Sequence, residues 1–180
     1  MELEHDITAG WDVASRDDQQ PTIDYFTALL ARHSDDPRAL FESACAWDWG
    51  GQPDKAVPLY ERAFAAGLEG DRLRRGLLQY GSSLRNLDRA EEAVTVLERA
   101  NRLFPNSDAV RSFLALALLS AGRPNEAVAD LLDLALDGIH SDDFTRYQWA
   151  FRHYAAALRR GDWSATEDDG RTQALPALRT

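Results

Sequence analysis

The chain has 180 residues, of which 44% are apolar and 28% charged, a composition typical of one globular domain. Thirty acidic side chains against 20 basic ones give a net charge of −10. Nucleic acids and anionic membranes are bound mainly through basic side chains, so this charge argues against both as partners. The single cysteine, Cys45, excludes an internal disulfide framework and a cysteine-rich zinc site.

The N-terminal residues lack the basic and apolar regions of a secretory signal, and no apolar run is long enough to predict a transmembrane helix. We therefore expect a cytoplasmic protein. The first predicted elements are a short helix near residues 4–15 and an amphipathic helix over 21–33, which ends at the breaker before Pro37. Residues 1–36 thus form N-terminal helices, and their interpretation as a degenerate repeat stays open.

Three segments between residues 37 and 136 align with one another. In each, a small residue is followed at a constant interval by an alanine; the pairs are Ala44/Ala56, Gly81/Ala93 and Ala115/Ala127. The recurrence of the alanines at positions 56, 93 and 127 is typical of a two-helix unit that cannot bury its apolar face alone. Small residues let two antiparallel helices approach closely. The predicted units span residues 37–70, 71–105 and 106–136.

This pattern resembles the tetratricopeptide repeat, whose signature W-x₂-L-G-x₂-Y…A-x₃-F…P returns once in each two-helix unit. Large residues fill other slots of the signature, and Pro105 fills its proline slot. The large residues are Leu40, Trp47 and Tyr60, then Leu77, Tyr80, Leu84 and Leu97, then Leu114, Leu118 and Leu131. The resemblance, to a small stand-alone bacterial protein of this family, covers residues 37–136. It implies an all-α, right-handed superhelical solenoid of antiparallel helix pairs that binds other proteins.

A further helix is predicted over residues 141–160, because Asp142 and Asp143 can cap it. Its aromatic residues are Phe144, Tyr147, Trp149, Phe151 and Tyr154. A lone terminal helix normally caps the end of a solenoid, and these aromatics also suit a contact between two copies of the chain. Residues 161–180 are expected to form a flexible tail.

Catalytic and metal-binding signatures are absent from the sequence. The four histidines stand far apart, and no nucleotide-binding or nucleophile motif occurs. Glu42 and Asp48 flank Cys45 on a predicted helix and should raise the pKa of its thiol, which disfavours a nucleophilic role. We therefore predict no enzyme, no cofactor and no metal.

The resemblance places the first helix of each unit on a concave groove. Helical spacing assigns the following residues to it: Arg38, Phe41, Cys45, Asp48, Trp49, Arg75, Leu78, Ser82, Arg85, Asn86, Ser112, Leu116 and Leu119. Such a groove suits a peptide or an amphipathic helix of another protein. Family members that bind the C-terminus of heat-shock proteins use Lys and Asn there, and neither occurs at Phe41, Cys45, Gln79, Ala109 or Phe113.

Charge is unevenly distributed along the chain. Residues 1–36 carry −7, whereas residues 71–104 carry +2, with arginines at 72, 74, 75 and 85. These arginines either bind an acidic segment of a partner or pair with the acidic N-terminal segment in cis. The leading functional hypothesis is a non-enzymatic module that binds a partner segment in the groove. The alternative is a secretion-type or general chaperone or adaptor that acts as a homodimer.

Overall fold

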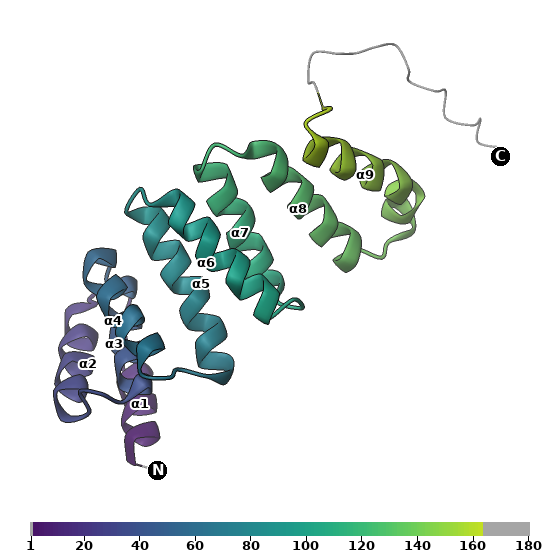
Figure 1. Cartoon of the computed structure of the whole chain (residues 1–180). Helices are drawn as coiled ribbons and strands as arrows, with labels where there is room; N and C mark the ends of the chain where they lie inside the picture. Colours follow the sequence, from purple (N-terminus) through teal and green to yellow (C-terminus); the bar gives the residue numbers. More distant parts are fainter. Residues whose placement is uncertain (1, 164–180) are drawn as a thin grey trace, which may run out of the picture.

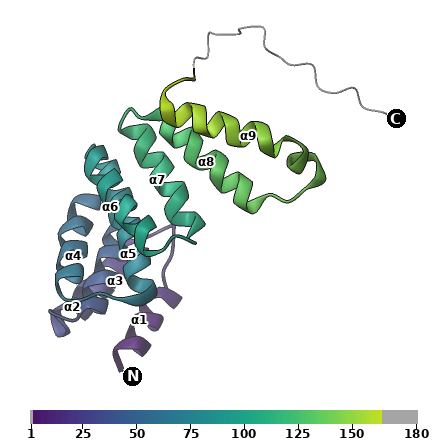
Figure 2. The same ribbon diagram turned by 45° about the vertical axis from the view of Figure 1, so that its right-hand side comes forward.

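The computed structural model describes residues 2–163, which form nine helices and no strand. The helices are α1 (Glu2–Asp12), α2 (Gln20–Arg32), α3 (Pro37–Trp49), α4 (Pro53–Ala65), α5 (Gly70–Asn86), α6 (Ala90–Leu103), α7 (Asp108–Ser120), α8 (Pro124–Gly138) and α9 (Asp142–Arg160). They follow one another in space as in sequence, with the N-terminus and α9 at opposite ends (Figure 1; Figure 2). The all-α solenoid predicted from the sequence is confirmed.

Capping side chains and prolines set where the helices of the α3/α4 and α7/α8 pairs begin. The first helices α3 and α7 begin after Asp36 and Ser107, whose side chains accept hydrogen bonds from the backbone amides of Arg38 and Val110. The second helices α4 and α8 begin with a proline, whose missing N–H costs nothing in the first turn.

The turn inside each of the three pairs from α3 to α8 has one residue with positive φ. These residues are Gly51 (φ 72°), Asp88 (φ 59°) and Gly122 (φ 73°). The turns between α3 and α4, α5 and α6, and α7 and α8 therefore each contain one residue in the left-handed conformation.

Small residues hold the two helices of a pair close together. A Cβ added to Gly81 of α5 would lie 2.6 Å from Cγ of Leu97 on α6. The same closeness occurs between α1 and α2, where a Cβ on Gly10 would lie 2.8 Å from Cζ of Phe26. Buried Thr22 follows Gly10 at the interval that separates Gly81 from Ala93, and the other two pairs share it. Helices α1 and α2 therefore pack as another pair.

The last helix does not continue the stack. Helices α5 and α7 each contact the preceding first helix, whereas α9 makes no backbone contact with α7, both helices lying within the described residues. Instead α9 packs along α8, where Ala155 and Leu158 bury against Ala129. Of the predicted tail, residues 161–163 are described and the rest lies outside the described residues. No helix among residues 2–163 has the length and apolar character of a membrane span.

Candidate functional site

The residues assigned to the groove belong to α3, α5 and α7, the first helices of three successive pairs. We call the side of α3, α5 and α7 that carries these residues, together with the adjoining helix α1, the first-helix face. Its three sections, on α1 and α3, on α5, and on α7, differ in chemistry.

Ion pairs cover the section formed by α1 and α3. Arg38 donates to Glu4 at 3.0 Å and to Asp36 at 2.7 Å. Arg72 of α5 donates to Glu4 at 2.7 Å and through Nε to Glu42 at 3.2 Å. The hydrogen bond from Arg72 lowers the pKa of Glu4 below its usual value. Arg72 therefore pairs with the protein's own N-terminal helix, one of the two possibilities that the sequence left open.

Glu42 is the member of this cluster that the sequence did not single out. Its side chain is only 3% exposed, and its Oε2 accepts a hydrogen bond of 2.8 Å from Nε1 of Trp11. Trp11 in turn stands edge-on to half-buried Trp49, with ring centroids 6.0 Å apart. Glu42 is held between the indole of Trp11 and the guanidinium of Arg72, so its role is structural. The sequence could not indicate this role, because it depends on how α1 packs against α3.

Phe41 and Cys45, which we expected to line the groove, are buried. Helix α5 covers both: the guanidinium of exposed Arg75 lies 5.4 Å from the ring centre of Phe41, and Sγ of Cys45 lies 2.9 Å from Oε1 of Gln79. Burial, helped by the charge of Glu42, raises the pKa of the Cys45 thiol, in the direction predicted. These two side chains join consecutive pairs and present no surface to a ligand.

Asp48 has a similar position near the end of α3. Its Oδ1 accepts a hydrogen bond of 2.7 Å from the hydroxyl of buried Ser83 on α5. Burial raises the pKa of Asp48, and the hydrogen bond from Ser83 opposes that rise. Asp48 is therefore a half-buried interhelical contact.

The section on α5 is polar and accessible. Arg75 and Asn86 are exposed, whereas Leu78, Ser82 and Arg85 are half-buried. Arg74 pairs with Asp71 at 2.7 Å, but no carboxylate among residues 2–163 lies within ion-pair distance of Arg75 or Arg85. Arg85 makes one long contact of 3.5 Å with Asn86. Within the described residues, these two guanidinium groups are therefore without a carboxylate partner.

The section on α7 is more apolar. Leu116 and Leu119 are exposed, while Ser112 turns its hydroxyl back to the carbonyl of Asp108 at 2.8 Å. Exposed Arg75 and half-buried Arg85 on α5 thus lie on the helix that contacts α7, which carries exposed Leu116 and Leu119. That these residues line a binding groove stays a prediction.

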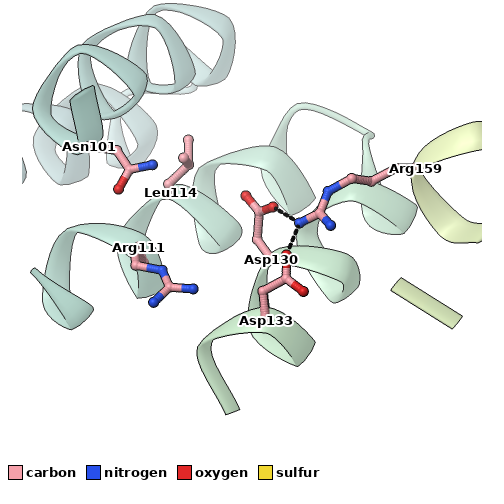
Figure 3. A pocket seen from close by; sticks show the side chains of 6 residues that line it. All are labelled: Asn101, Arg111, Leu114, Asp130, Asp133 and Arg159. Carbon is pink, nitrogen blue, oxygen red and sulfur yellow. Dashed lines mark hydrogen bonds and ion pairs between the residues drawn. The ribbon is translucent and has the colours of Figure 1, made fainter. Parts of the chain in front are cut away.

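A cavity of about 180 Å³ lies elsewhere, lined by Asn101, Arg111, Leu114, Asp130, Asp133 and Arg159 (Figure 3). Its charges neutralise one another: Arg159 pairs with Asp130 at 2.8 Å and Asp133 at 2.7 Å, and Arg111 pairs with Asp137 at 2.8 Å. No group of three metal-ligating side chains occurs among the described residues. This cavity lies among α6, α7, α8 and α9, and each charged residue that lines it already pairs with another side chain.

A family model described as tetratrico peptide repeat matches residues 37–158. The chain belongs to the tetratricopeptide repeat family. Members of this family are generally non-enzymatic scaffolds for protein–protein interaction. A search of curated proteins found no match.

Three solved structures share the fold of this tetratricopeptide repeat protein. YrrB, described as a TPR protein with an unusual peptide-binding site, is 18% identical over 78% of this chain and 74% of its own, with a TM-score of 0.56. A MamA RS-1 ArsTM double mutant is 15% identical over 89% and 96%, with a TM-score of 0.63. PilF of Pseudomonas aeruginosa is 19% identical over 90% and 77%, with a TM-score of 0.55. At these identities the likeness concerns the fold alone.

Proposed function

We propose that the protein binds an acidic segment of a partner protein, as an extended peptide or an amphipathic helix, on the α5 and α7 sections of the first-helix face. The observation that carries the proposal is that Arg75 and Arg85 have no carboxylate partner among the described residues. A guanidinium binds a carboxylate through two parallel hydrogen bonds, so these arginines suit Asp or Glu side chains of a ligand. Exposed Leu116 and Leu119 on α7 would receive its apolar residues.

The α1 and α3 section contributes less to this function. Arg38 and Arg72 already donate to Glu4, Asp36 and Glu42, so a ligand would have to displace existing ion pairs there. The acidic N-terminal helix thus limits the binding surface to the second and third pairs. The peptide-binding description of YrrB is compatible with such a role and is that protein's own property.

Selection from a displayed random peptide library tests the proposal. We expect the wild-type protein to enrich acidic peptides that the double variant Arg75→Glu/Arg85→Glu no longer binds. Arg99→Glu is the matched control, since Arg99 is an exposed arginine on the second helix α6. Calorimetry of one enriched peptide should show at least about a tenfold loss of affinity for the double variant and none for the control. Equal binding by all three proteins would refute the assignment of this face.

A further inference from the structure

The beginning of α9 keeps the register of the repeats. The hydroxyl of Ser141 accepts a hydrogen bond from the amide of Phe144, as that of Ser107 accepts one from Val110 at the start of α7. The spacing between the two serines equals the spacing between Ala93 and Ala127, which is one repeat period. Helix α9 therefore begins where the first helix of another pair would begin, although it packs differently.

Within this chain, each first helix covers a defined surface of the preceding pair. Helix α5 contacts Cys45 and Asp48 of α3, and Cys45 touches Tyr60 of α4 at 3.8 Å. On the second helices α4 and α6 the covered residues are Val57 and Tyr60, then Val94 and Leu97, all at most 5% exposed. In the third pair the positions equivalent to these are occupied by Leu116, Leu119, Val128 and Leu131.

In the third pair this surface is open. Leu116 is 41% exposed, Leu119 57%, Val128 48% and Leu131 45%. Because α9 makes no backbone contact with α7, nothing in the described part of the chain takes the place that α5 and α7 take on the earlier pairs. Leu116 and Leu131 occupy the positions that Cys45 and Tyr60 occupy in the α3/α4 pair, where these two side chains touch across the pair. The exposed residues of α7 and α8 therefore form one patch. We call these four residues the open end face.

Helix α9 carries the side chains that such a face receives. Phe144, Tyr147 and Phe151 stand one repeat period after Val110, Phe113 and Ala117, the residues with which α7 faces α5 and α6. Of these side chains, Phe144 and Phe151 are half-buried and stack on each other with ring centroids 4.9 Å apart. Tyr147 and Tyr154, its neighbour two turns later, are exposed. The chain thus has both the open face and a helix patterned to cover it, without joining the two.

Contacts on α8 keep α9 from covering the open end face of its own chain. Ala155 and Leu158 bury against Ala129, and Arg159 pairs with both Asp130 and Asp133. These contacts hold the C-terminal part of α9 on the side of α8 that carries Ala129. The equivalent residue of α6, Thr95, is exposed, so no helix covers that side in the preceding pair. Covering the face in cis would break all of them, whereas a helix from another molecule breaks none.

We propose that the open end face binds the exposed tyrosines of α9, Tyr147 and Tyr154, from a second copy of the chain, forming a two-fold dimer through the C-terminal ends. The side chains of α9 favour this partner: Tyr147 and Tyr154 are exposed, and Arg146 and Arg152 form no ion pair within residues 2–163. The four acids of α8 already pair within their own chain, with Arg111, Arg123 and Arg159.

The contact is reciprocal, since each copy gives one helix and one face. The dimer leaves Arg75 and Arg85 of α5 free but covers Leu116 and Leu119. A ligand bound to the dimer would therefore contact the α5 section, and the apolar contacts on α7 would be open to it only in the monomer.

Sedimentation equilibrium over micromolar to submillimolar concentration tests the dimer. We expect the wild-type chain to dimerise, and Leu131→Glu in the face or Tyr147→Glu in α9 to raise the dimer dissociation constant at least about tenfold. Leu103→Glu is the matched control, a leucine 51% exposed at the end of α6, and should dimerise like the wild type. Circular dichroism and urea unfolding check that each variant folds, and Leu119→Glu replaces Leu131→Glu if the latter does not.

Mixing the two variants makes the test specific. A chain with a damaged face and an intact α9 can still give its helix to a chain with a damaged α9 and an intact face. The equimolar mixture of Leu131→Glu and Tyr147→Glu should therefore associate more tightly than either variant alone. A wild-type chain that stays monomeric, as closure of α9 in cis would make it, overturns the proposal, and so does a mixture that does not recover association. Arg75→Glu/Arg85→Glu should leave the mass unchanged, which separates this test from that of the binding face.

Discussion

Arg72 on α5 reaches past α3 and donates to Glu4 on α1, with Nη2 2.7 Å from Oε2. Through Nε the same guanidinium donates to Glu42, which also accepts a hydrogen bond from the indole of Trp11. One side chain therefore connects three first helices and neutralises a carboxylate that is almost fully buried. The stability of the N-terminal half should depend on it.

Replacing Arg72 by methionine keeps the apolar stem and removes the charge. Glu42 then stays buried with Trp11 as its remaining side-chain partner, so we expect the free energy of unfolding to fall by about 2 kcal/mol. Urea denaturation measures the loss. The control is Arg102→Met, which removes an exposed pair with Glu98 at 3.8 Å and should cost less than about 0.5 kcal/mol. Equal losses in the two variants would contradict a structural role of the cluster.

Asp48 should make stability fall as pH rises. Burial raises its pKa above the usual value, so protonated Asp48 stabilises the fold, and this contribution is lost as pH rises through the raised pKa. At neutral pH the buried carboxylate is a cost, and Asp48→Asn should increase the free energy of unfolding. Its oxygen can still accept from Ser83. The gain should shrink as pH falls through the raised pKa of Asp48, because the wild-type carboxyl then becomes protonated.

Urea titrations at neutral and acidic pH measure the effect of Asp48→Asn. Asp17→Asn changes an exposed carboxylate in the turn between α1 and α2 and serves as the control, with little effect at either pH. A gain for Asp48→Asn that is the same at both pH values would disprove the explanation by burial.

Replacing two glycines by alanine should change the free energy of unfolding in different ways, because one lies in a close helix contact and the other in open space. In Gly81→Ala the new Cβ meets Leu97 at 2.6 Å, so we expect a loss of about 1–3 kcal/mol from overpacking. Gly138, the last residue of α8, has nothing within 4 Å of the same Cβ position. Gly138→Ala should therefore be neutral or gain up to about 1 kcal/mol. Thermal unfolding of both variants decides, and a stabilised Gly81→Ala would show that the pair can separate at little cost.

Cys45 should resist thiol reagents in the folded protein. The side chain is buried, lies against Gln79 and has a thiol whose pKa is raised by burial. We expect Ellman's reagent to react at least about a hundredfold more slowly with the native chain than with the urea-unfolded chain, because reaction requires opening. Similar rates would mean that α5 leaves Cys45 accessible.

The helix pairs could be predicted because their packing depends on residues close in sequence. Gly81 and Leu97 meet across one turn, and the spacing of small residues records this contact. The groove assignments of Phe41 and Cys45 were wrong because a single helix does not reveal which of its sides the next pair covers. Their apolar character was the available signal, since both contribute to burial between α3 and α5.

The placement of α9 was beyond the repeat pattern for a related reason. Helix α8 is apolar on two sides, with Val128 and Leu131 on one and Ala129 and Leu132 on the other. Helix α6 has polar Thr95 where α8 has Ala129, so it offers one apolar side only. A second apolar side on α8 indicates a second place where α9 can bind, and spacing alone does not choose between them.

The bond between Glu4 and Arg72 also changes how the chain should lose its structure. In a repeat array each unit normally contacts its neighbours alone, and opening spreads from one interface to the next. Helices α1 and α5 belong to pairs that are not neighbours, yet they are joined directly. Amide hydrogen exchange should therefore show α1 to α5 opening as one cooperative block, whereas α9, which contacts α8 as its only helical neighbour in the described chain, opens separately and at lower free energy.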